Sequence, residues 1–428
     1  MNVVVFEDPA VDWLGEIVAA RPACDLTIGS RTLCESLGHL GHVRRALRPY
    51  LARHLAAVGT TRIPLWGGAV ESPVATPAAS RHGAVTLLVN ARVVPSRRNI
   101  VALRGLVEAG RRGVIRTDGG TLAALLHLAP DGGGPDRTVH DDVLARGPAA
   151  VAAIDALALP AADVALDTVA LPHDVVTAHE QTLAESLATR IDSGGYREMK
   201  PGLFVAPAAT VAEFVVVRQG PVVVEADAEI GPFVCLDGPV WIGPAARVNP
   251  HAWLRGGTAV GRSCRVGGEV EASVLEPFSN KPHDGFLGHS HVGSWVNLAA
   301  GTITSNLKAS YGPVRIHAAG RDGGRETIET GRQFLGALVA DFVKTAINTS
   351  IPCGCRIGAA ATVGGDVPER VAAFHNMLVG GAAGSRSTVD QTATALGRMM
   401  ARRGLDMLAA DRDLLAALAE DARFGSKA

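Results

Sequence analysis

The chain has 428 residues, which fits two or three domains at the usual size of about 150 residues each. Lysine and arginine (41 residues) nearly balance aspartate and glutamate (42 residues), so the net charge of −1 carries no electrostatic sign of a nucleic-acid partner. No apolar run reaches the ~18 residues of a membrane-spanning helix, so we expect no membrane anchor.

The N-terminal half alternates strand-like and helix-like segments. Buried strands are predicted at 3–6 and 84–96, and helices at 31–59, 100–113 and 173–191. This alternation predicts an α/β domain with a largely parallel sheet, to which we assign residues 1–195. Basic residues recur at helix-like spacing in the segment 42–54, which we interpret as the solvated face of the first helix.

The six cysteines are scattered and contain no CxxC pair. A structural zinc site is therefore not expected, no residue is assigned as a metal ligand, and reduced thiols in the cytoplasm are predicted. The acidic residues Glu7 and Asp8 near the start do not fit a signal peptide, which also favours a cytoplasmic location.

Apolar residues recur every six positions after residue 216. A period of six excludes a helix or a simple strand and is typical of the hexapeptide repeat of a parallel β-helix, to which we assign residues 196–370. In such coils the repeated residue points inward and small residues turn the corners. The repeat positions are Val224, Ile230, Leu236, Ile242, Val248, Leu254, Val260 and Val266.

Two breaks interrupt this repeat, at 267–285 and 308–333. The inward register is predicted to resume at Phe286, Val292 and Leu298, and again at Thr345, Ile351, Ile357 and Val363. Breaks in a solenoid are usually loops on one face, often the binding face. Beyond residue 370 we predict helices at 387–424 that begin with a capping box at Thr388–Gln391, and we assign residues 371–428 to a helical cap over the last coil.

Several polar residues around the first break are candidates for chemistry. His283 is either a general base or a surface histidine. Clustered with His289 and His291, it could bind zinc between subunits, as in a carbonic-anhydrase-like β-helix. Asn297 and Asn306 are either members of an internal asparagine ladder or ligands of a sugar. Arg255 and Lys308 are either phosphate ligands or exposed charges.

The order of these motifs resembles the GlmU family of bifunctional bacterial enzymes that make UDP-N-acetylglucosamine. The segment "NKPHDGFLG" (280–288) followed by "VNLAAGTITSNLK" (296–308) matches the acetyltransferase domain of that family. A divergent GlmU-like group with a sugar-nucleotidyltransferase-like first domain is the closer match. It shares "VVVFEDPA" (3–10), the segment 21–32 with its "RP-x-x-D-L" pattern, and "NARVVPS" (90–96).

The resemblance implies residue roles. His283 would remove a proton from a sugar amine, which then attacks the thioester of acetyl-CoA or another acyl-CoA. Phe286, Asn297, Asn306, Arg255 and Lys308 would lie at the acceptor. The backbone at Ala300 and Gly301 would face the thioester, and the later coils with Lys344 and Ala359 would hold CoA. The resemblance further implies a left-handed β-helix and a homotrimer with sites between subunits.

The sequence also departs from the GlmU pattern. Phe286 replaces a tyrosine, which removes one hydroxyl contact. The glycine-rich nucleotide loop and its Pro-Lys are not found near residues 3–32. Arg21, Asp25 and Arg31 are the remaining candidates for nucleotide contacts, and a Mg²⁺ ion in the N-terminal domain follows from the resemblance alone.

We therefore expect a cytoplasmic GlmU-like transferase that acylates an aminosugar phosphate or a nucleotide aminosugar. Its partners would be small-molecule substrates, with no nucleic acid and no membrane. The N-terminal domain would bind or form the nucleotide sugar. The alternatives are a trimeric binding or scaffold protein without catalysis and the zinc carbonic-anhydrase-like enzyme.

Overall fold

The computed structural model describes residues 1–59, 62–67, 84–129, 133–319, 325–380 and 383–421. The end of the predicted helical segment, residues 422–424, lies outside these ranges. Contacts divide the chain into two units. The first holds Met1–Leu14, Arg21–Pro64 and Gly68–Leu171, and the second holds Gly15–Ala20, Leu65–Gly67 and Pro172–Ala428.

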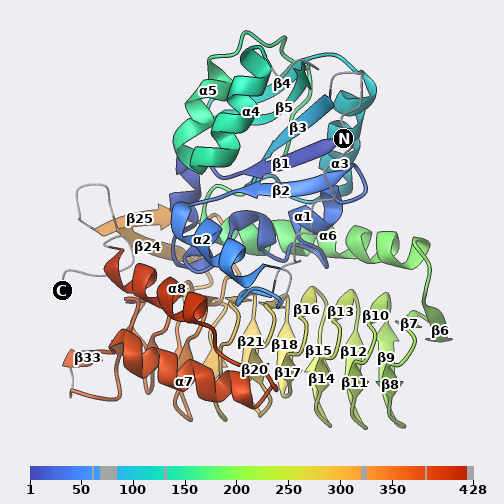
Figure 1. The fold of residues 1–428 in the computed structure, drawn as a ribbon. Coiled ribbons are helices and arrows are strands. Elements are labelled where there is room, and N and C mark those ends of the chain that lie inside the picture. Colours follow the sequence, from blue (N-terminus) through green and yellow to red (C-terminus); the bar gives the residue numbers. More distant parts are fainter. Residues whose placement is uncertain (60–61, 68–83, 130–132, 320–324, 381–382, 422–428) are drawn as a thin grey trace. The chain divides into compact units, whose positions relative to one another are not determined.

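The first unit is built on a five-stranded mixed sheet with the order β2-β1-β3-β5-β4 (Figure 1). β1 pairs in parallel with both neighbours, whereas β5 is antiparallel to β3 and β4. The prediction of a largely parallel sheet is therefore wrong for half of it, because the turn "TDGG" (117–120) joins β4 and β5 as a hairpin. The strands are β1 (Asn2–Phe6), β2 (His42–Ala46), β3 (Ala84–Asn90), β4 (Gly113–Thr117) and β5 (Gly120–Leu128).

Helices of the first unit pack on this sheet through a shared apolar core. Val139, Val143 and Ile154 contribute to a cluster with Val4 and Leu126, which are buried on the sheet. The helices are α1 (Leu33–Leu37), α2 (Pro49–Val58), α3 (Arg97–Glu108), α4 (Pro135–Arg146) and α5 (Val151–Asp155), with short 3₁₀ turns η2 (Ala23–Asp25) and η3 (Gly147–Ala150).

The single helix predicted at 31–59 is wrong, because β2 interrupts it. Arg48 precedes a proline and is extended (φ −52°, ψ 139°), so the second helix can only begin at Pro49. The basic segment before it forms the edge strand β2 beside β1. Gly41 permits this approach, because a β-carbon there would overlap the carbonyl oxygen of Met1.

The second unit is a parallel β-helix, as predicted, with three sheets along its length (Figure 1). The first sheet contains β6 (Arg197–Lys200), β7 (Leu203–Val205), β10 (Val222–Val224), β13 (Val240–Ile242), β16 (Thr258–Val260), β19 (Val274–Leu275), β22 (His291–Val292), β26 (Leu338–Val339), β29 (Arg356–Ile357) and β31 (Arg370–Val371).

The other two sheets complete each coil. The second contains β8 (Thr210–Val211), β11 (Glu229–Ile230), β14 (Arg247–Val248), β17 (Arg265–Val266), β20 (Asn280–Lys281), β27 (Lys344–Thr345), β30 (Thr362–Val363), β32 (His375–Asn376) and β33 (Ser385–Arg386), with Asn297 bridging β20 to β27. The third contains β9 (Val216–Gln219), β12 (Cys235–Asp237), β15 (Trp253–Leu254), β18 (Glu269–Glu271) and β21 (Phe286–Gly288), continued by β23 (Ile303–Thr304) and β28 (Ser350–Ile351).

The interior of the coils confirms the hexapeptide register. All eight predicted repeat positions from Val224 to Val266 are at most 3% exposed and belong to one core cluster. Val292, Leu298, Ile351, Ile357 and Val363 join the same cluster, and Thr345 is buried beside it. Stacked coils hide these side chains from water, and this burial is the main force that stabilises a solenoid.

The register prediction fails at one place, the end of the first break. Leu287 is buried in the core, and its neighbour Phe286 is only half-buried. Leu287 lies six residues after Lys281, which is 1% exposed and pairs with the inward residue Val266. The inward column therefore passes through a lysine, which a search for apolar residues cannot detect.

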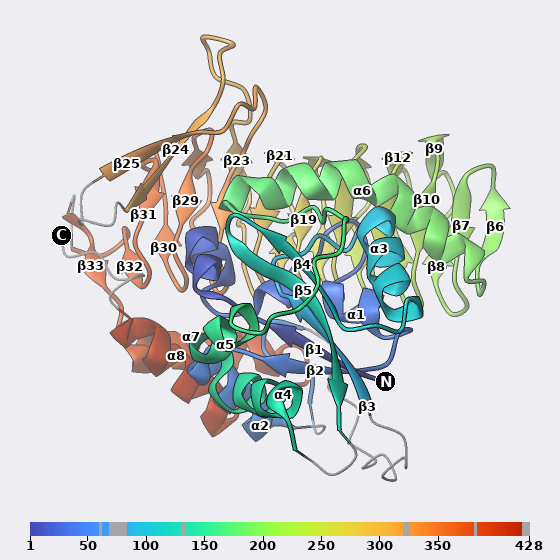
Figure 2. The same cartoon turned by 90° about the horizontal axis from the view of Figure 1, so that it is seen from above.

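Further elements flank the coils. α6 (Pro172–Asp192) lies along the first sheet and packs Leu183 and Leu187 on Val223 and Trp241 (Figure 2). The second break forms the hairpin β24 (Arg315–Ala319) and β25 (Arg325–Glu329). The capping box at Thr388 is confirmed and begins α7 (Val389–Ala401), which is followed by α8 (Ala409–Glu420). Among the described residues, no helix is long and apolar enough to cross a membrane.

Candidate functional site

The loop that carries His283 (residues 282–285) is held from inside the β-helix. Nζ of Lys281 donates to the carbonyl oxygens of Gly267 (2.9 Å), His283 (3.1 Å) and Gly285 (2.8 Å). Burial lowers the pKa of Lys281 to about 8. The side chain of His283 is exposed, so the loop presents its imidazole to solvent on a fixed backbone.

This loop stacks on the corner of the next coil, which contains Ala300 and Gly301. A β-carbon on Gly285 would overlap the carbonyl oxygen of Thr302, so the two backbones are in direct contact. Gly301 has a φ of 70°, in the left-handed region that suits glycine. In the described part of the chain, the backbone N–H groups of Ala300 and Gly301 have no hydrogen-bond partner. The corner therefore offers two donors beside the His283 loop.

Phe286 and Asn306 meet on the third sheet. Both lie against Gly288, where a β-carbon would overlap the ring of Phe286 and approach Nδ2 of Asn306. Arg255, two coils away, is held by Glu269 (3.1 Å) and Glu271 (2.8 Å) and stacks over the ring of Trp253. Arg255 is thus committed to protein partners in this chain.

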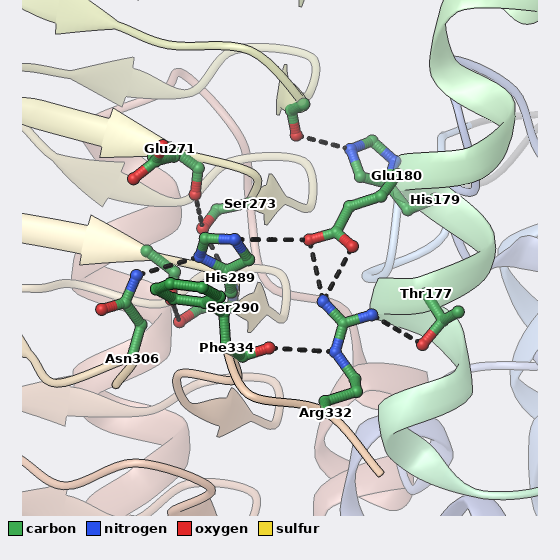
Figure 3. Close-up of polar contacts among 12 residues, drawn as sticks. Thr177, His179, Glu180, Glu271, Ser273, His289, Ser290, Asn306, Arg332 and Phe334 are labelled. Atoms are coloured by element: carbon green, nitrogen blue, oxygen red, sulfur yellow. Dashed lines mark hydrogen bonds and ion pairs between the residues drawn. The ribbon is translucent and has the colours of Figure 1, made fainter. Parts of the chain in front are cut away.

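A cluster of polar residues, which we call the His289 cluster, joins α6 to the third sheet (Figure 3). Asn306 Nδ2 donates to Nδ1 of His289 (3.0 Å), and Nε2 of His289 lies 3.7 Å from Oε1 of Glu180. Arg332 binds both carboxylate oxygens of Glu180, at 2.9 and 2.7 Å, and Oγ1 of Thr177. The ring of Phe334 stacks on His289, with the centroids 5.2 Å apart. The cluster fixes the orientation of Asn306.

Burial and neighbouring charges perturb this cluster. Burial, helped by the positive charges of Arg332 and Arg255, lowers the pKa of His289 to about 4, so its imidazole is neutral at pH 7. Burial raises the pKa of Glu180, against the opposing effect of Arg332. The pKa of Glu271 is raised for the same reason, although Arg255 opposes the shift. These groups form a semi-buried patch with both signs of charge next to Asn306.

His289 is expected to make the free energy of unfolding depend on pH. Its folded pKa lies below the unfolded value of 6.5, so the unfolded chain binds more protons and stability falls as pH drops from about 6.5 to about 4. The contribution over this window is about 3 kcal/mol, at about 1.4 kcal/mol per pKa unit. The variant His289→Asn, whose residue tolerates the local φ of 48°, should lose this dependence in denaturant titrations.

His251→Asn is the matched control, because His251 has a similar φ of 62° but is exposed. Glu180 affects the free energy of unfolding in the opposite sense. Because its folded pKa is raised, its contribution to stability falls as pH rises. Comparing the variants over the same pH range removes most of that effect. Parallel curves for wild type and His289→Asn would contradict the assignment.

The remaining residues predicted to bind CoA or the acceptor lie on other surfaces. Asn297 is half-buried on the second sheet, in one outer column with Asn280 and Lys344, so it is not part of an internal ladder. Nζ of Lys344 donates to the carbonyl of Phe342, and burial lowers its pKa. Ala359 is 1% exposed at a different corner of the coil. One chain therefore does not gather all the predicted residues in one place.

Lys308 lines a cavity of about 590 Å³ between the coils and the hairpin β24–β25. Its Nζ donates to the carbonyl of Pro313 (3.1 Å). Cys353 lies on the same wall, with its Sγ 2.9 Å from Oγ of Ser305. His317 and Glu369, 3.2 Å apart, form an ion pair on the lining when the histidine is protonated. The cavity lining combines these polar side chains with apolar surface from Leu307, Val314 and Pro352, and it has room for part of a ligand.

The three histidines of the zinc alternative do not converge within one chain. His291 is fully buried beside Glu276, whereas His283 is exposed on its loop and His289 belongs to the His289 cluster. In the described ranges, no group of three close ligand atoms includes any of them.

The predicted nucleotide contacts of the first unit are engaged within the protein. Arg21 is fully buried, Asp25 is paired with Arg45 (3.2 Å), and Arg31 closes a tight turn with Ile28.

The carboxylates at the carboxyl end of β1 are engaged in the same way. Arg48 binds both carboxylate oxygens of Glu7, and Arg92 binds both of Asp8. Because arginines occupy both oxygens of each carboxylate, Glu7 and Asp8 do not fit a Mg²⁺ site, which needs free carboxylate oxygens.

Sequence reasoning missed Lys281, Glu180 and Arg332. Lys281 could have been found, because it lies six residues from Leu275 and from Leu287. Glu180 and Thr177 are three residues apart on one helix face, but nothing in the sequence links them to Arg332 in the second break.

The chain is similar to several known proteins. Residues 3–193 match the family described as sugar nucleotidyl transferase. A bifunctional sugar-1-phosphate nucleotidylyltransferase/acetyltransferase of Sulfurisphaera tokodaii is 36% identical over 95 residues, which is 22% of each chain. A bifunctional protein GlmU of Methanococcus vannielii is 31% identical over 96 residues, again 22% of each chain. A solved Francisella novicida UDP-N-acetylglucosamine acyltransferase aligns over 47% of this chain and 74% of that one, at 11% identity and a TM-score of 0.20.

The family match and the two curated relatives confirm the resemblance drawn from the sequence. Residues 3–193 match the sugar nucleotidyl transferase family, the second unit is a β-helix, and curated GlmU relatives match over 22% of the chain. The match spans only about a fifth of the length of these curated relatives.

Proposed function

We propose that the β-helix transfers an acetyl group, or a related acyl group, from CoA to the amine of an aminosugar phosphate or nucleotide aminosugar. The observation that carries this proposal is the contact between the His283 loop and the corner at Ala300 and Gly301. A histidine able to accept a proton and two backbone donors lie on successive coils at the same corner. Such a pair serves acyl transfer, which needs a base and a group that stabilises an oxyanion.

The reaction follows from these groups. His283 accepts a proton from the sugar amine, whose nitrogen attacks the thioester carbonyl carbon. Negative charge develops on the carbonyl oxygen, which the N–H groups of Ala300 and Gly301 stabilise. The carbon–sulfur bond then breaks, the acyl group stays on nitrogen as an amide, and CoA leaves as the thiol after taking up a proton. Phe286 and Asn306, fixed beside Gly288, hold the acceptor.

A homotrimer is part of this proposal. Phe286 and Asn306 lie on the third sheet, whereas Asn297 and Lys344 lie on the second, so the predicted site residues are divided between two faces of one β-helix. A neighbouring copy would therefore supply the opposite wall of the site. The sugar nucleotidyl transferase domain would bind the nucleotide sugar, and no step is routed through Mg²⁺.

The test is turnover by the purified full chain. Acetyl-CoA is mixed with glucosamine-1-phosphate or UDP-glucosamine, and the acetylated product is measured by mass. Acceptor-dependent product supports the proposal. Absence of product with every aminosugar, together with binding of the same nucleotide sugars, would favour the scaffold alternative.

Cys353 reports on whether the cavity beside Lys308 holds a ligand. Alkylation of this half-buried thiol by a maleimide is expected to slow at least about tenfold in saturating acetyl-CoA or sugar phosphate, because a bound ligand blocks access. Peptide mass spectrometry measures the rate at each cysteine. Cys235, also half-buried but on β12, is the internal control and should react at an unchanged rate. Equal effects on both cysteines would remove the cavity from the proposed site.

A further inference from the structure

Two thiols and a carboxylate meet inside the first unit. The ligand atoms of Cys24, Asp25 and Cys34 all lie within 4.8 Å of one another. Their side chains are buried, with residue exposures of 0, 2 and 5%. Within the part of the chain that the structure describes, no other group of three such residues is this close. The acetyl-transfer proposal makes no use of this trio.

Nine residues separate Cys24 from Cys34 in the sequence, and the local backbone folds back to bring the two side chains together. Cys24 belongs to the 3₁₀ turn η2, and Cys34 lies in the first turn of α1. Ile28 and Arg31 pair in an antiparallel bridge that folds the intervening segment back on itself. A capping box between Thr32 and Glu35 then fixes the start of α1. The spacing hides the pair from any search for CxxC motifs.

The charges of the cluster suit a divalent cation. Arg45 contacts Oδ1 of Asp25 at 3.2 Å, so the carboxylate is oriented by a hydrogen bond from outside, as metal-bound carboxylates are. The metal-free cluster of Asp25 and Arg45 with two neutral thiols has no net charge. Adding a divalent cation and releasing two thiol protons leaves the net charge at zero, so burial does not oppose the exchange by adding charge.

We propose that Cys24, Asp25 and Cys34 bind a zinc ion. Thiolate ligands select zinc over Mg²⁺ and Ca²⁺, which prefer oxygen ligands. Binding converts both thiols to thiolates, and their two protons pass to solvent. Three protein ligands leave the fourth tetrahedral position to a water molecule or a backbone oxygen. Because the site is buried, the ion enters as the chain folds.

The experiment measures metal in the full chain, purified without chelator. Elemental analysis is expected to find about one zinc per chain, and Co²⁺ exchanged during refolding should show a thiolate-to-metal absorption band. Cys24→Ser and Cys34→Ser are each expected to lower zinc affinity more than about tenfold and to remove or weaken that band. Asp25→Asn keeps both thiols and should weaken binding while retaining the band.

Cys264→Ser is the matched control, since Cys264 is an equally buried thiol in the β-helix. It should keep one zinc per chain. If a cysteine variant fails to fold, Co²⁺ absorption of Asp25→Asn still decides the matter. A full-length wild-type chain without zinc and without the cobalt band, or one with a Cys24–Cys34 disulfide in peptide mass spectra, would overturn the proposal.

Discussion

Replacement of His283 by alanine is expected to lower kcat/KM for acetyl transfer by about 10²–10⁴-fold, the usual contribution of a general base. His283 is an exposed histidine on the loop whose Gly285 contacts Thr302, next to the corner formed by Ala300 and Gly301. Without it, the ammonium form of the acceptor has no group to take its proton. The loss should appear mainly in kcat, because the acceptor contacts at Phe286 and Asn306 remain.

The control for this substitution is His251→Asn, at an exposed histidine two coils away whose φ of 62° asparagine tolerates. Both substitutions remove a solvated imidazole, so both should change the free energy of unfolding by less than about 0.5 kcal/mol. Steady-state rates over pH 6–9 (roughly the range in which an imidazole base acts) separate the roles. A His283→Ala enzyme with the wild-type rate and pH profile would disprove the base assignment.

The β-helix could be predicted from the sequence because each coil repeats the same demand. Each side of a coil buries one inward side chain. That side chain must be apolar unless hydrogen-bond partners inside the coil satisfy a polar one. Val224 and the seven positions after it obey this rule and are buried as expected. The first unit was harder, because helix-like spacing in 42–46 also fits an edge strand. Pairing with β1, a contact remote in the sequence, decided that case.

The functional site could be predicted only in part. The motif order named His283, Phe286 and Asn306, and the last two do lie together at Gly288. His289 orients Asn306, and the groups behind His289 come from α6 (Glu180) and from the second break (Arg332), more than a hundred residues apart. The contact between Glu180 and Arg332 depends on how α6 packs on the first sheet, and no local sequence pattern predicts that packing. The same limit hid Cys24 and Cys34, which a folded-back segment brings together.

Lys281→Met is expected to lower acetyl transfer by about 10²-fold while leaving the β-helix folded, since a displacement of about 1 Å can cost that much. Methionine fills the same inward position between Leu275 and Leu287 but donates no hydrogen bond. The carbonyls of His283 and Gly285 then lose their shared donor, and the loop is free to shift. Neither the acceptor contacts nor the corner donors change, so the loss should fall on kcat.

The pH dependence of the free energy of unfolding gives a second, independent test of the same variant. Lys281 has a folded pKa of about 8 against 10.5, so between these values the unfolded chain holds the extra proton and wild-type stability rises with pH. The gain is about 3 kcal/mol at about 1.4 kcal/mol per pKa unit, and Lys281→Met should lack it. Lys200→Met, which removes an amine bonded to a single carbonyl at the start of the β-helix, is the control and should keep the wild-type slope. Lys281→Met with wild-type activity, and with the wild-type pH dependence of the free energy of unfolding, would contradict both roles. The ammonium would then neither hold the loop nor have a pKa lowered by burial.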